Sequence, residues 1–214
     1  MSDFQNTIDL LGDDVVAASI VDRSIKTFDD NVIKNIGERV FCGCQALTSV
    51  NFPSAISIDG YAFYYCSNLA SVNIPLVTSI GYSAFYYCRY LTSINLPLVT
   101  SIKSSAFNGC SKLTSLNLPS LTSIDSYAFQ DCAELISINL PSLTNINYSS
   151  FINCSKLASI RLPAVPPTST GSNPFDGVPT TCVIYIPTGS LAAYQADTKW
   201  SSLISKYTFT EEDR

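Results

Sequence analysis

The sequence predicts a solenoid, in which one short structural unit is repeated and stacked along an axis. Three observations support this: a 22-residue period that keeps register six times, an apolar pattern that no single unit could bury alone, and irregular units at both ends. Self-similarity at a fixed period of roughly 20 to 50 residues is typical of such arrays. We therefore expect an α/β solenoid that forms a single domain over residues 1–214.

The repeat is visible as columns of identical residues spaced 22 positions apart. The phenylalanine column is Phe41, Phe63, Phe85, Phe107, Phe129 and Phe151. The cysteine column is Cys44, Cys66, Cys88, Cys110, Cys132 and Cys154. Columns of leucine and proline keep the same step as the phenylalanine and cysteine columns. Chance matches would not keep this many columns in register without a single slip, so the repeat is real.

Each unit contains a strand pattern followed by a turn pattern. The unit that begins at Leu91 reads LTSINLPLVTSIKSSAFNGCSK. Ile94 and Leu96 lie two apart and so share one face of a short strand. The proline that follows has no backbone N–H and stops the strand. Phe107 and Cys110 lie three apart, which places them on the same side of one helical or 3₁₀ turn. Stacked units would bury these side chains in a continuous core.

Both ends of the repeat region are irregular. Residues 25–162 carry the 22-residue repeats, and the first of them is degenerate, with Asp30 where an inward apolar residue is expected. Terminal repeats of a solenoid commonly depart from the pattern in this way because they cap the stack. We expect residues 1–24 to form an N-terminal cap of short strands or a helix, and residues 163–214 to form an irregular last repeat and a C-terminal cap.

The C-terminal cap has its own signals. After an insertion of two residues, Ile184 and Ile186 return to the strand positions. Ser190 is a suitable N-cap residue for a helix with the sequence SLAAYQADTKW. Trp200 and Leu203 follow, and we expect them to cover the last unit together with the neighbouring isoleucine.

The composition excludes several functions. The net charge is −5 and the pI is about 4.5, whereas a protein that tracks phosphates needs a basic face. No apolar run approaches the ~18 residues of a membrane span. The chain has no histidine, which removes Ser-His-Asp catalysis and histidine-containing metal sites. We expect no catalytic residue, cofactor, metal, nucleic-acid partner or membrane span.

The start of the chain, MSDFQNTIDLLGDD, is polar and acidic and lacks the apolar core of a signal peptide. Either the protein is not exported by that route, or its sequence begins after a removed signal.

The cysteine column would suggest metal or redox chemistry if the spacing were C-x-x-C, but the step of 22 residues is not a metal spacing. Each cysteine follows an inward phenylalanine by three residues, and buried free cysteine behaves as a small hydrophobe. We therefore expect free, buried thiols, although neighbouring cysteines could come within disulfide distance. Cys42 lies outside the column and is expected nearer to solvent.

A group of tyrosines occupies positions that are not uniform from repeat to repeat, and it is our first candidate binding surface. Its members are Tyr64, Tyr65, Tyr82, Tyr86, Tyr87 and Tyr90. The later units carry Asn108, Gly109, Gln130 and Asp131 at the positions of the four paired tyrosines, so the scaffold does not require tyrosine there. Tyrosine is favoured in interfaces because it offers a large area at low entropic cost. The alternative is that these rings only pack along the convex surface.

A polar column on the strands is the second candidate. It begins at Asn51 and continues through Asn73, Asn95, Asn117 and Asn139 to Arg161. These residues alternate with the inward apolar residues, so they point outward from the strand face. They would present a flat polar surface to a partner, or would merely hydrogen-bond along the solenoid and solvate it.

The repeating motif C-x-x-L-T-S-I-N-L-P-x-L-T-S-I-x-x-x-A-F resembles the BspA-like leucine-rich repeats, and the ending IYIPTGSLAAYQADTKWSSL is similar to the closing segment often seen in that family. The resemblance covers roughly residues 25–205. It implies a leucine-rich-repeat right-handed superhelix with short parallel strands on the concave face and short helical or 3₁₀ turns on the convex face. It also implies an extracellular or cell-surface protein, often an adhesin, and it carries no catalytic motif.

Two functional hypotheses follow. The first is a non-enzymatic scaffold of a surface or adhesion type that binds a protein or a glycan. The second is a structural spacer in a phage or cell-envelope protein, with no ligand of its own. Exposed edge strands at the solenoid ends would also permit self-association.

Overall fold

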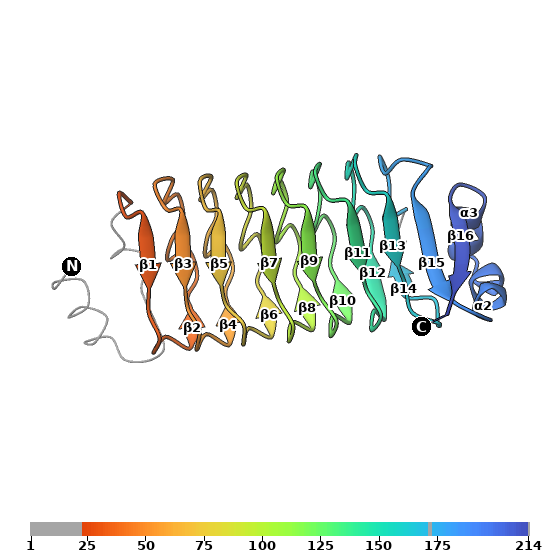
Figure 1. The fold of residues 1–214 in the computed structure, drawn as a ribbon, viewed down its shortest axis with the longest axis horizontal. Coiled ribbons are helices and arrows are strands. Elements are labelled where there is room, and N and C mark those ends of the chain that lie inside the picture. The colour runs from red at the N-terminus through yellow and green to blue at the C-terminus, as the bar shows by residue number, and fades with distance from the viewer. Residues whose placement is uncertain (1–22, 171–172, 214) are drawn as a thin grey trace.

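The computed structural model describes residues 23–170 and 173–213, which form one elongated solenoid of parallel strands (Figure 1). Each regular turn of the solenoid, here called a rung, contributes one strand to each of two ladders, and the last two strands extend the first ladder alone. The first ladder contains β1 (Thr27–Asp29), β3 (Ser49–Asn51), β5 (Ser71–Asn73), β7 (Ser93–Asn95), β9 (Ser115–Asn117), β11 (Ser137–Asn139), β13 (Ser159–Arg161), β15 (Val183–Pro187) and β16 (Thr208–Glu212). The second ladder contains β2 (Asn35–Ile36), β4 (Ser57–Ile58), β6 (Ser79–Ile80), β8 (Ser101–Ile102), β10 (Ser123–Ile124), β12 (Asn145–Asn147) and β14 (Thr168–Thr170).

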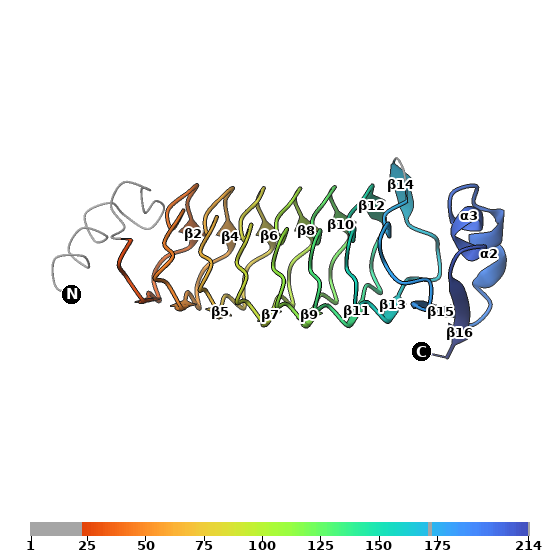
Figure 2. The same cartoon turned by 90° about the horizontal axis from the view of Figure 1, so that it is seen from above.

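The strands pair in parallel and in register, so that residues 22 apart face one another within the repeats. Val50 pairs with Val72, for example, and Ile80 pairs with Ile102. The second ladder is one continuous sheet of seven strands, whereas the first divides into groups between β5 and β7 and between β9 and β11. The two ladders run along different sides of the solenoid, as the two views show (Figures 1 and 2).

The core is a stack of phenylalanine rings that runs along the axis. Neighbouring rings from Phe41 to Phe151 lie 5.1–5.5 Å apart between centroids and within 9° of parallel. Phe175 continues the stack beyond the insertion, at 5.8 Å and 26°. These rings are fully buried together with the leucine and isoleucine columns. The centroid spacing is close to the ~4.8 Å distance between hydrogen-bonded strands, so the side chains repeat at the step of the backbone.

The third side of each rung consists of turns, where a helical or 3₁₀ segment was expected. Ala84, Tyr86 and Cys88 donate their N–H groups to carbonyls three residues earlier. The turns do not continue into a helix because Ser83 and Tyr87 are left-handed, with φ of 51° and 57°. Other N–H groups on this side point to the next rung: that of Phe85 donates to the Ala106 carbonyl at 2.8 Å.

The cysteine column is buried and its thiols are free. Each thiol from Cys66 to Cys154 donates to the carbonyl of the phenylalanine 25 residues earlier, at 2.9–3.2 Å. The same carbonyl accepts the N–H of the cysteine on its own rung; the Phe63 carbonyl, for example, accepts the Cys66 N–H at 3.1 Å. Cysteine therefore fills the core and adds one hydrogen bond between consecutive rungs. Cys42 is partly exposed.

The N-terminal cap expected over residues 1–24 lies almost wholly outside the described residues. In the degenerate first rung, Asp30 is buried, and one of its carboxylate oxygens accepts the N–H groups of Val32 and Ile33 at 2.8 Å each. A polar residue at an inward position is tolerated there because it closes a turn.

The C-terminal cap differs from the single helix expected after Ser190. Two short helices form, α2 (Leu191–Ala196) and α3 (Trp200–Ile204). The Ser190 side chain does not cap α2. Glu211 on β16 accepts the Leu191 N–H at 2.9 Å instead, so the cap comes from a distant strand. Asp197 ends the first helix and accepts the N–H of Trp200 at 3.0 Å, which starts the second.

Three aromatic side chains of the cap satisfy carbonyls of the irregular rung. Tyr194 donates its hydroxyl to the Pro163 carbonyl at 2.7 Å, and Trp200 donates its indole N–H to the Pro167 carbonyl at 2.8 Å. Tyr207 donates to the Phe175 carbonyl at 2.7 Å. No further regular rung follows to supply backbone donors, and buried carbonyls without a partner are costly. The aromatic residues therefore close the open end of the stack.

We expect Phe107→Ala to destabilise the protein by about 3–5 kcal/mol, because it opens a cavity in the middle of the ring stack. Urea unfolding measures the change. Leu98→Ala is the matched control, since Leu98 is 44% exposed, and it should change stability by no more than about 0.5 kcal/mol. A loss below about 1 kcal/mol for Phe107→Ala would show that the ring stack does not carry the core.

The buried thiols predict a loss of stability in alkali. Burial raises the pKa of Cys154 to about 12 and that of Cys182 to about 11, against 9.0 for a free thiol. Above pH 9 the unfolded chain ionises its thiols while the folded chain keeps them protonated, so stability should fall as the pH rises from about 9 toward these folded values. Each buried thiol contributes up to about 1.4 kcal/mol per pH unit.

Urea unfolding between pH 7 and 10.5 tests this. Burial also raises the pKa of the Cys110 thiol, so Cys110→Ala should reduce the slope of stability against pH. An unchanged slope in that variant would contradict the account.

Candidate functional site

Five tyrosines on the turn side form a connected cluster, here called the tyrosine stack: Tyr61, Tyr64, Tyr65, Tyr86 and Tyr87. Tyr64 lies on Tyr86 with ring centroids 4.9 Å apart, and Tyr65 lies on Tyr87 at 5.2 Å. Within each rung the neighbouring rings meet at 4.7 Å and 4.8 Å. Tyr61 joins edge-on to Tyr64 at 5.5 Å. Because the rungs stack in register, the pairs Tyr64–Tyr65 and Tyr86–Tyr87 lie on one another and form one surface.

Three members of the stack have an unfavourable backbone. Tyr61, Tyr65 and Tyr87 are left-handed, with φ of 59°, 56° and 57°. A left-handed backbone costs roughly 1–2 kcal/mol for most residues and is adopted routinely only by glycine, asparagine and aspartate. The other rungs follow this rule at the position of Tyr65 and Tyr87, where they carry Gly43, Gly109, Asp131 and Asn153. At Tyr65 and Tyr87 tyrosine is thus a departure that the scaffold does not favour, whereas the column of Tyr61 is left-handed on the other repeats too, with serine or tyrosine at most of them.

The stack presents hydrogen-bonding groups and cations to solvent. Its rings stack on one another across the rungs, Tyr65 is 37% exposed, and the other four members are partly buried. Among the described residues no phenol of the stack has a hydrogen-bond partner. The guanidinium of Arg39 lies 4.7 Å from the Tyr61 ring, and that of Arg89 lies 4.8 Å from the Tyr87 ring. Cation–π contacts of this kind hold arginine beside aromatic rings.

The phenols of Tyr64 and Tyr86 stay protonated near neutral pH. Partial burial, aided by the neighbouring phenol of Tyr65, raises the pKa of Tyr64. Burial and the phenol of Tyr87 raise the pKa of Tyr86 in the same way. Each hydroxyl can therefore donate and accept one or more hydrogen bonds to a ligand.

Two tyrosines that the sequence grouped with the stack lie apart from it. Tyr82 and Tyr90 are 54% and 58% exposed, and the ring contacts that join the stack do not reach them in the described part of the chain. Tyr82 borders a hollow beside Gly60 and Gly81. Conversely, Tyr61 belongs to the stack although its sequence position did not single it out.

The polar column on the strands is partly tied into the scaffold. Asn73 donates to the side-chain carbonyl of Asn51 at 2.6 Å, and Asn117 donates to that of Asn95 at 3.1 Å. Both bonds lie within a group of paired strands, whereas the Asn73–Asn95 and Asn117–Asn139 steps coincide with the breaks between groups. The column thus serves the scaffold at some steps and leaves amide groups exposed at others.

Arg161, at the end of this column, is held by the cap. Its Nε lies 2.9 Å from Oε1 of Glu212, and its guanidinium lies 4.8 Å from the Tyr185 ring. Its first role is therefore to fasten β16 to the last rungs, rather than to present a free cation.

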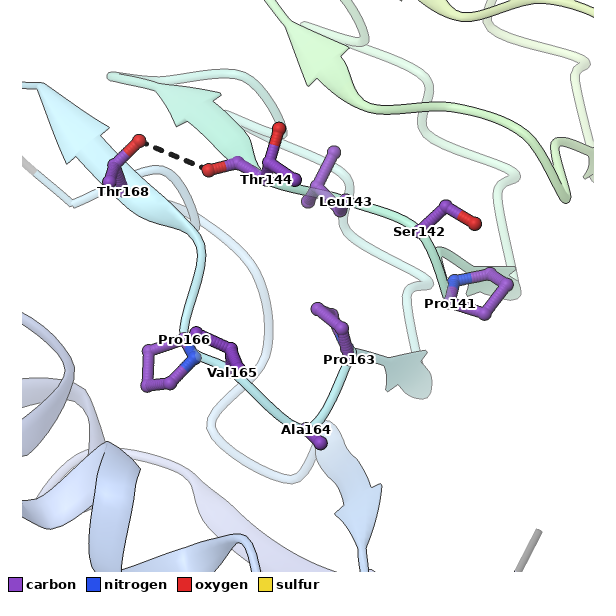
Figure 3. Close-up of a pocket in the computed structure, with 9 residues that line it drawn as sticks. All are labelled: Pro141, Ser142, Leu143, Thr144, Pro163, Ala164, Val165, Pro166 and Thr168. Carbon is purple, nitrogen blue, oxygen red and sulfur yellow. Dashed lines mark hydrogen bonds between the residues drawn. The ribbon is translucent and has the colours of Figure 1, made fainter.

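The insertion after Pro163 opens a second hollow, of about 480 Å³, between two rungs (Figure 3). Its lining consists of proline, alanine, valine, leucine, serine and threonine, and Val165 is 74% exposed. The Thr168 hydroxyl is occupied, because it donates to the Thr144 carbonyl at 3.0 Å. The lining offers no carboxylate, amine or thiol, so it contains no acid–base group that could activate its serine or threonine hydroxyls.

The described residues show neither a metal-binding cluster nor a membrane-spanning helix. Within them, no group of three or more histidine, cysteine, aspartate or glutamate side chains lies close enough to hold a metal ion. In the same ranges, no helix is long and apolar enough to span a membrane.

Comparisons with known proteins agree with the fold. The chain matches the model of the BspA type leucine rich repeat region, in six copies, over residues 21–119 and 78–192. These matches cover most of the chain, so the protein belongs to this family of repeat scaffolds, as the sequence motif indicated. No curated protein matches it.

Solved structures of similar proteins come from bacteria. A leucine rich cell surface protein from Faecalibacterium prausnitzii A2-165 shares 25% sequence identity with a TM-score of 0.58, and the match covers 76% of this chain and 55% of that protein. A leucine-rich repeat protein from Bacteroides ovatus ATCC 8483 shares 21% identity with a TM-score of 0.51, covering 90% of this chain and 59% of that one. The chain thus spans less than two thirds of the length of either.

We predict that Tyr87→Asn leaves the free energy of unfolding within about 1 kcal/mol of the parent. The lost ring contacts are worth about 0.5–1.5 kcal/mol, and asparagine relieves roughly 1–2 kcal/mol of left-handed strain. Tyr86→Asn is the matched control: it also introduces the residue of a later rung, but Tyr86 is not left-handed and gains no such relief. Urea unfolding of both variants measures this. A larger loss for Tyr87→Asn than for Tyr86→Asn would show that the strain is not real.

Proposed function

We propose that this protein is a non-enzymatic interaction module of a surface or adhesion type, which binds a protein or a glycan through the tyrosine stack. The observation that carries the proposal is the left-handed backbone of Tyr65 and Tyr87. Backbone strain of this kind persists where the surrounding structure imposes it, and it clusters at functional sites. A scaffold selected for stability alone would place glycine, asparagine or aspartate at both positions, as its other rungs do.

The surface chemistry of the stack supports the same proposal. Tyrosine and arginine are the residues that most often dominate binding energy in interfaces. Here Arg39, which also pairs with Glu38 at 3.2 Å, and Arg89 flank phenols that have no hydrogen-bond partner among the described residues. The Faecalibacterium protein is described as a cell surface protein, and we propose a surface location for this protein by analogy.

The strand face favours the second candidate, a structural spacer. Threonine hydroxyls next to the second ladder are used within the scaffold: Thr122 donates to the Thr100 carbonyl at 2.9 Å, and Thr144 donates to the Thr122 carbonyl at 3.0 Å. A long, uniform surface whose hydroxyl groups already bond within the scaffold can hold other parts of a protein apart, but it offers few groups for recognising a ligand. The tyrosine stack is the feature that a spacer would not need.

A binding screen separates the two candidates. The purified protein is tested against extracellular-matrix proteins and a glycan array, beside the double variant Tyr65→Asn/Tyr87→Asn, which introduces residues found on other rungs. Saturable binding that the double variant weakens at least tenfold is the expected result. Binding that the double variant keeps would overturn the tyrosine stack as the site. A folded, monodisperse protein that binds none of the probes would favour the spacer.

A further inference from the structure

A small notch lined by both polar and apolar residues lies beside the tyrosine stack. Its volume is about 260 Å³, and its lining comes from three rungs, including Asp59, Ser79, Tyr82 and Lys103. This volume lies below the roughly 300–1,000 Å³ of sites for drug-sized ligands. The notch can therefore hold one unit of a larger ligand, rather than the whole of it.

The notch exists because one column of outward side chains has a gap. The column reads Asp59, Gly81, Lys103, Asp125 and Asn147 from rung to rung. Farther along, its members bind one another: Asn147 donates to Asp125 at 3.2 Å, and Lys103 lies 3.9 Å from Asp125. At Gly81 the side chain is missing. The backbone requires glycine there, because a Cβ would lie 2.5 Å from the Asp59 carbonyl carbon.

The gap leaves polar groups of opposite character around one small space. In the described residues, the Asp59 carboxylate, the Ser79 hydroxyl and the Tyr82 phenol have no hydrogen-bond partner. Lys103 stands on the far side of Gly81, two rungs or ~10 Å from Asp59. Tyr82 is 54% exposed and lines the notch, and its backbone carbonyl and Cβ lie against Gly60, 3.5 and 3.9 Å from the Cβ position of that glycine. The notch thus combines an acceptor, a donor, two hydroxyls and an aromatic wall.

This set of groups fits a sugar. Sugar hydroxyls both donate and accept, so they can satisfy a carboxylate and an ammonium group at once, while the C–H face of the ring packs on an aromatic side chain. An anchoring side chain of a protein partner instead fills a well-packed, desolvated pocket, whereas this notch offers hydrogen-bonding groups that have no partner in the described residues. Asp59 and Lys103 contribute opposite charges, and Lys103 already faces Asp125, so the notch has no excess positive charge for an anionic unit.

The notch is continuous with the tyrosine stack. Gly60 lines it, and the next residue, Tyr61, donates its N–H to the Tyr82 carbonyl at 2.7 Å and starts the stack. We propose that the ligand is a neutral oligosaccharide, with one sugar unit in the notch against Tyr82 and its neighbours along the tyrosine stack. This inference rests on the proposed function and chooses glycan over protein as the partner.

The test uses variants that keep the fold. Tyr82→Ser introduces the residue that Ser104 and Ser126 provide in the same column, and Asp59→Asn removes only the charge. Tyr148→Ser is the matched control, because Tyr148 occupies the same column three rungs away and is 37% exposed. The probes are a glycan array with neutral and acidic members, followed by calorimetric titration with the neutral oligosaccharides that bind.

We expect neutral oligosaccharides to bind, and Tyr82→Ser and Asp59→Asn each to weaken binding by about tenfold or more, the loss typical of a hydrogen bond to a charged or buried group. Tyr148→Ser should bind as the parent does. Glycan binding that Tyr65→Asn/Tyr87→Asn abolishes but both notch variants keep would overturn this inference and leave the proposed function standing, as would binding to a protein alone. Preference for acidic members of the array would also overturn it. Binding of no probe by the intact protein would overturn both proposals.

Discussion

The in-register stacking of rungs is the constraint on which the rest of the structure depends. A step of 22 residues places each side chain on its own equivalent in the next rung, so every position becomes a column with one environment. Phenylalanine, cysteine and leucine fill the inward columns because those columns are dry. The same step requires both ends to satisfy backbone groups that have no further rung. Tyr194, Trp200 and Tyr207 do so at the C-terminal end.

Because most columns are uniform, departures from uniformity are informative. Tyrosine replaces glycine, asparagine or aspartate at Tyr65 and Tyr87, against the backbone preference, and Gly81 interrupts a column of charged and amide side chains. Both departures lie on the same few rungs, and the notch and the tyrosine stack meet at Tyr61. The strain at Tyr65 and Tyr87 has no evident benefit to folding, since the other rungs carry glycine, asparagine or aspartate there, whereas Gly81 is imposed by the close approach of the Asp59 backbone. We take their coincidence as the physical basis of the proposed glycan site.

The structure of the repeated units could be predicted from the sequence. The local geometry of the turns and of the irregular ends could not. The strands, the buried thiols and the last strand positions at Ile184 and Ile186 follow from counting, because a strict repeat translates directly into a ladder. On the turn side the sequence predicted short helical or 3₁₀ turns, and the structure shows turns that end at the left-handed residues Ser83 and Tyr87. Glycine, aspartate and asparagine on the other rungs signalled the left-handed backbone at the Tyr87 position, whereas serine at position 83 gave no such signal. Glu211, and not Ser190, caps the first helix of the C-terminal cap. The sequence could not predict this cap because the contact joins residues that lie 20 positions apart. Tyr61 could have been found, since it lies three residues before Tyr64 in the same turn.

Hydrogen exchange on the turn side tests the central claim most directly. The N–H groups of Phe63, Tyr65, Phe85, Tyr87 and Phe107 donate to carbonyls of the next rung at 2.8 Å. If rung-to-rung stacking holds the fold, these amides should exchange as slowly as those of the strands, and only through global unfolding. Rapid exchange of these amides while the strand amides stay protected would contradict the account. It would mean that the strands alone hold the fold and that the turns form no stable hydrogen bonds between rungs.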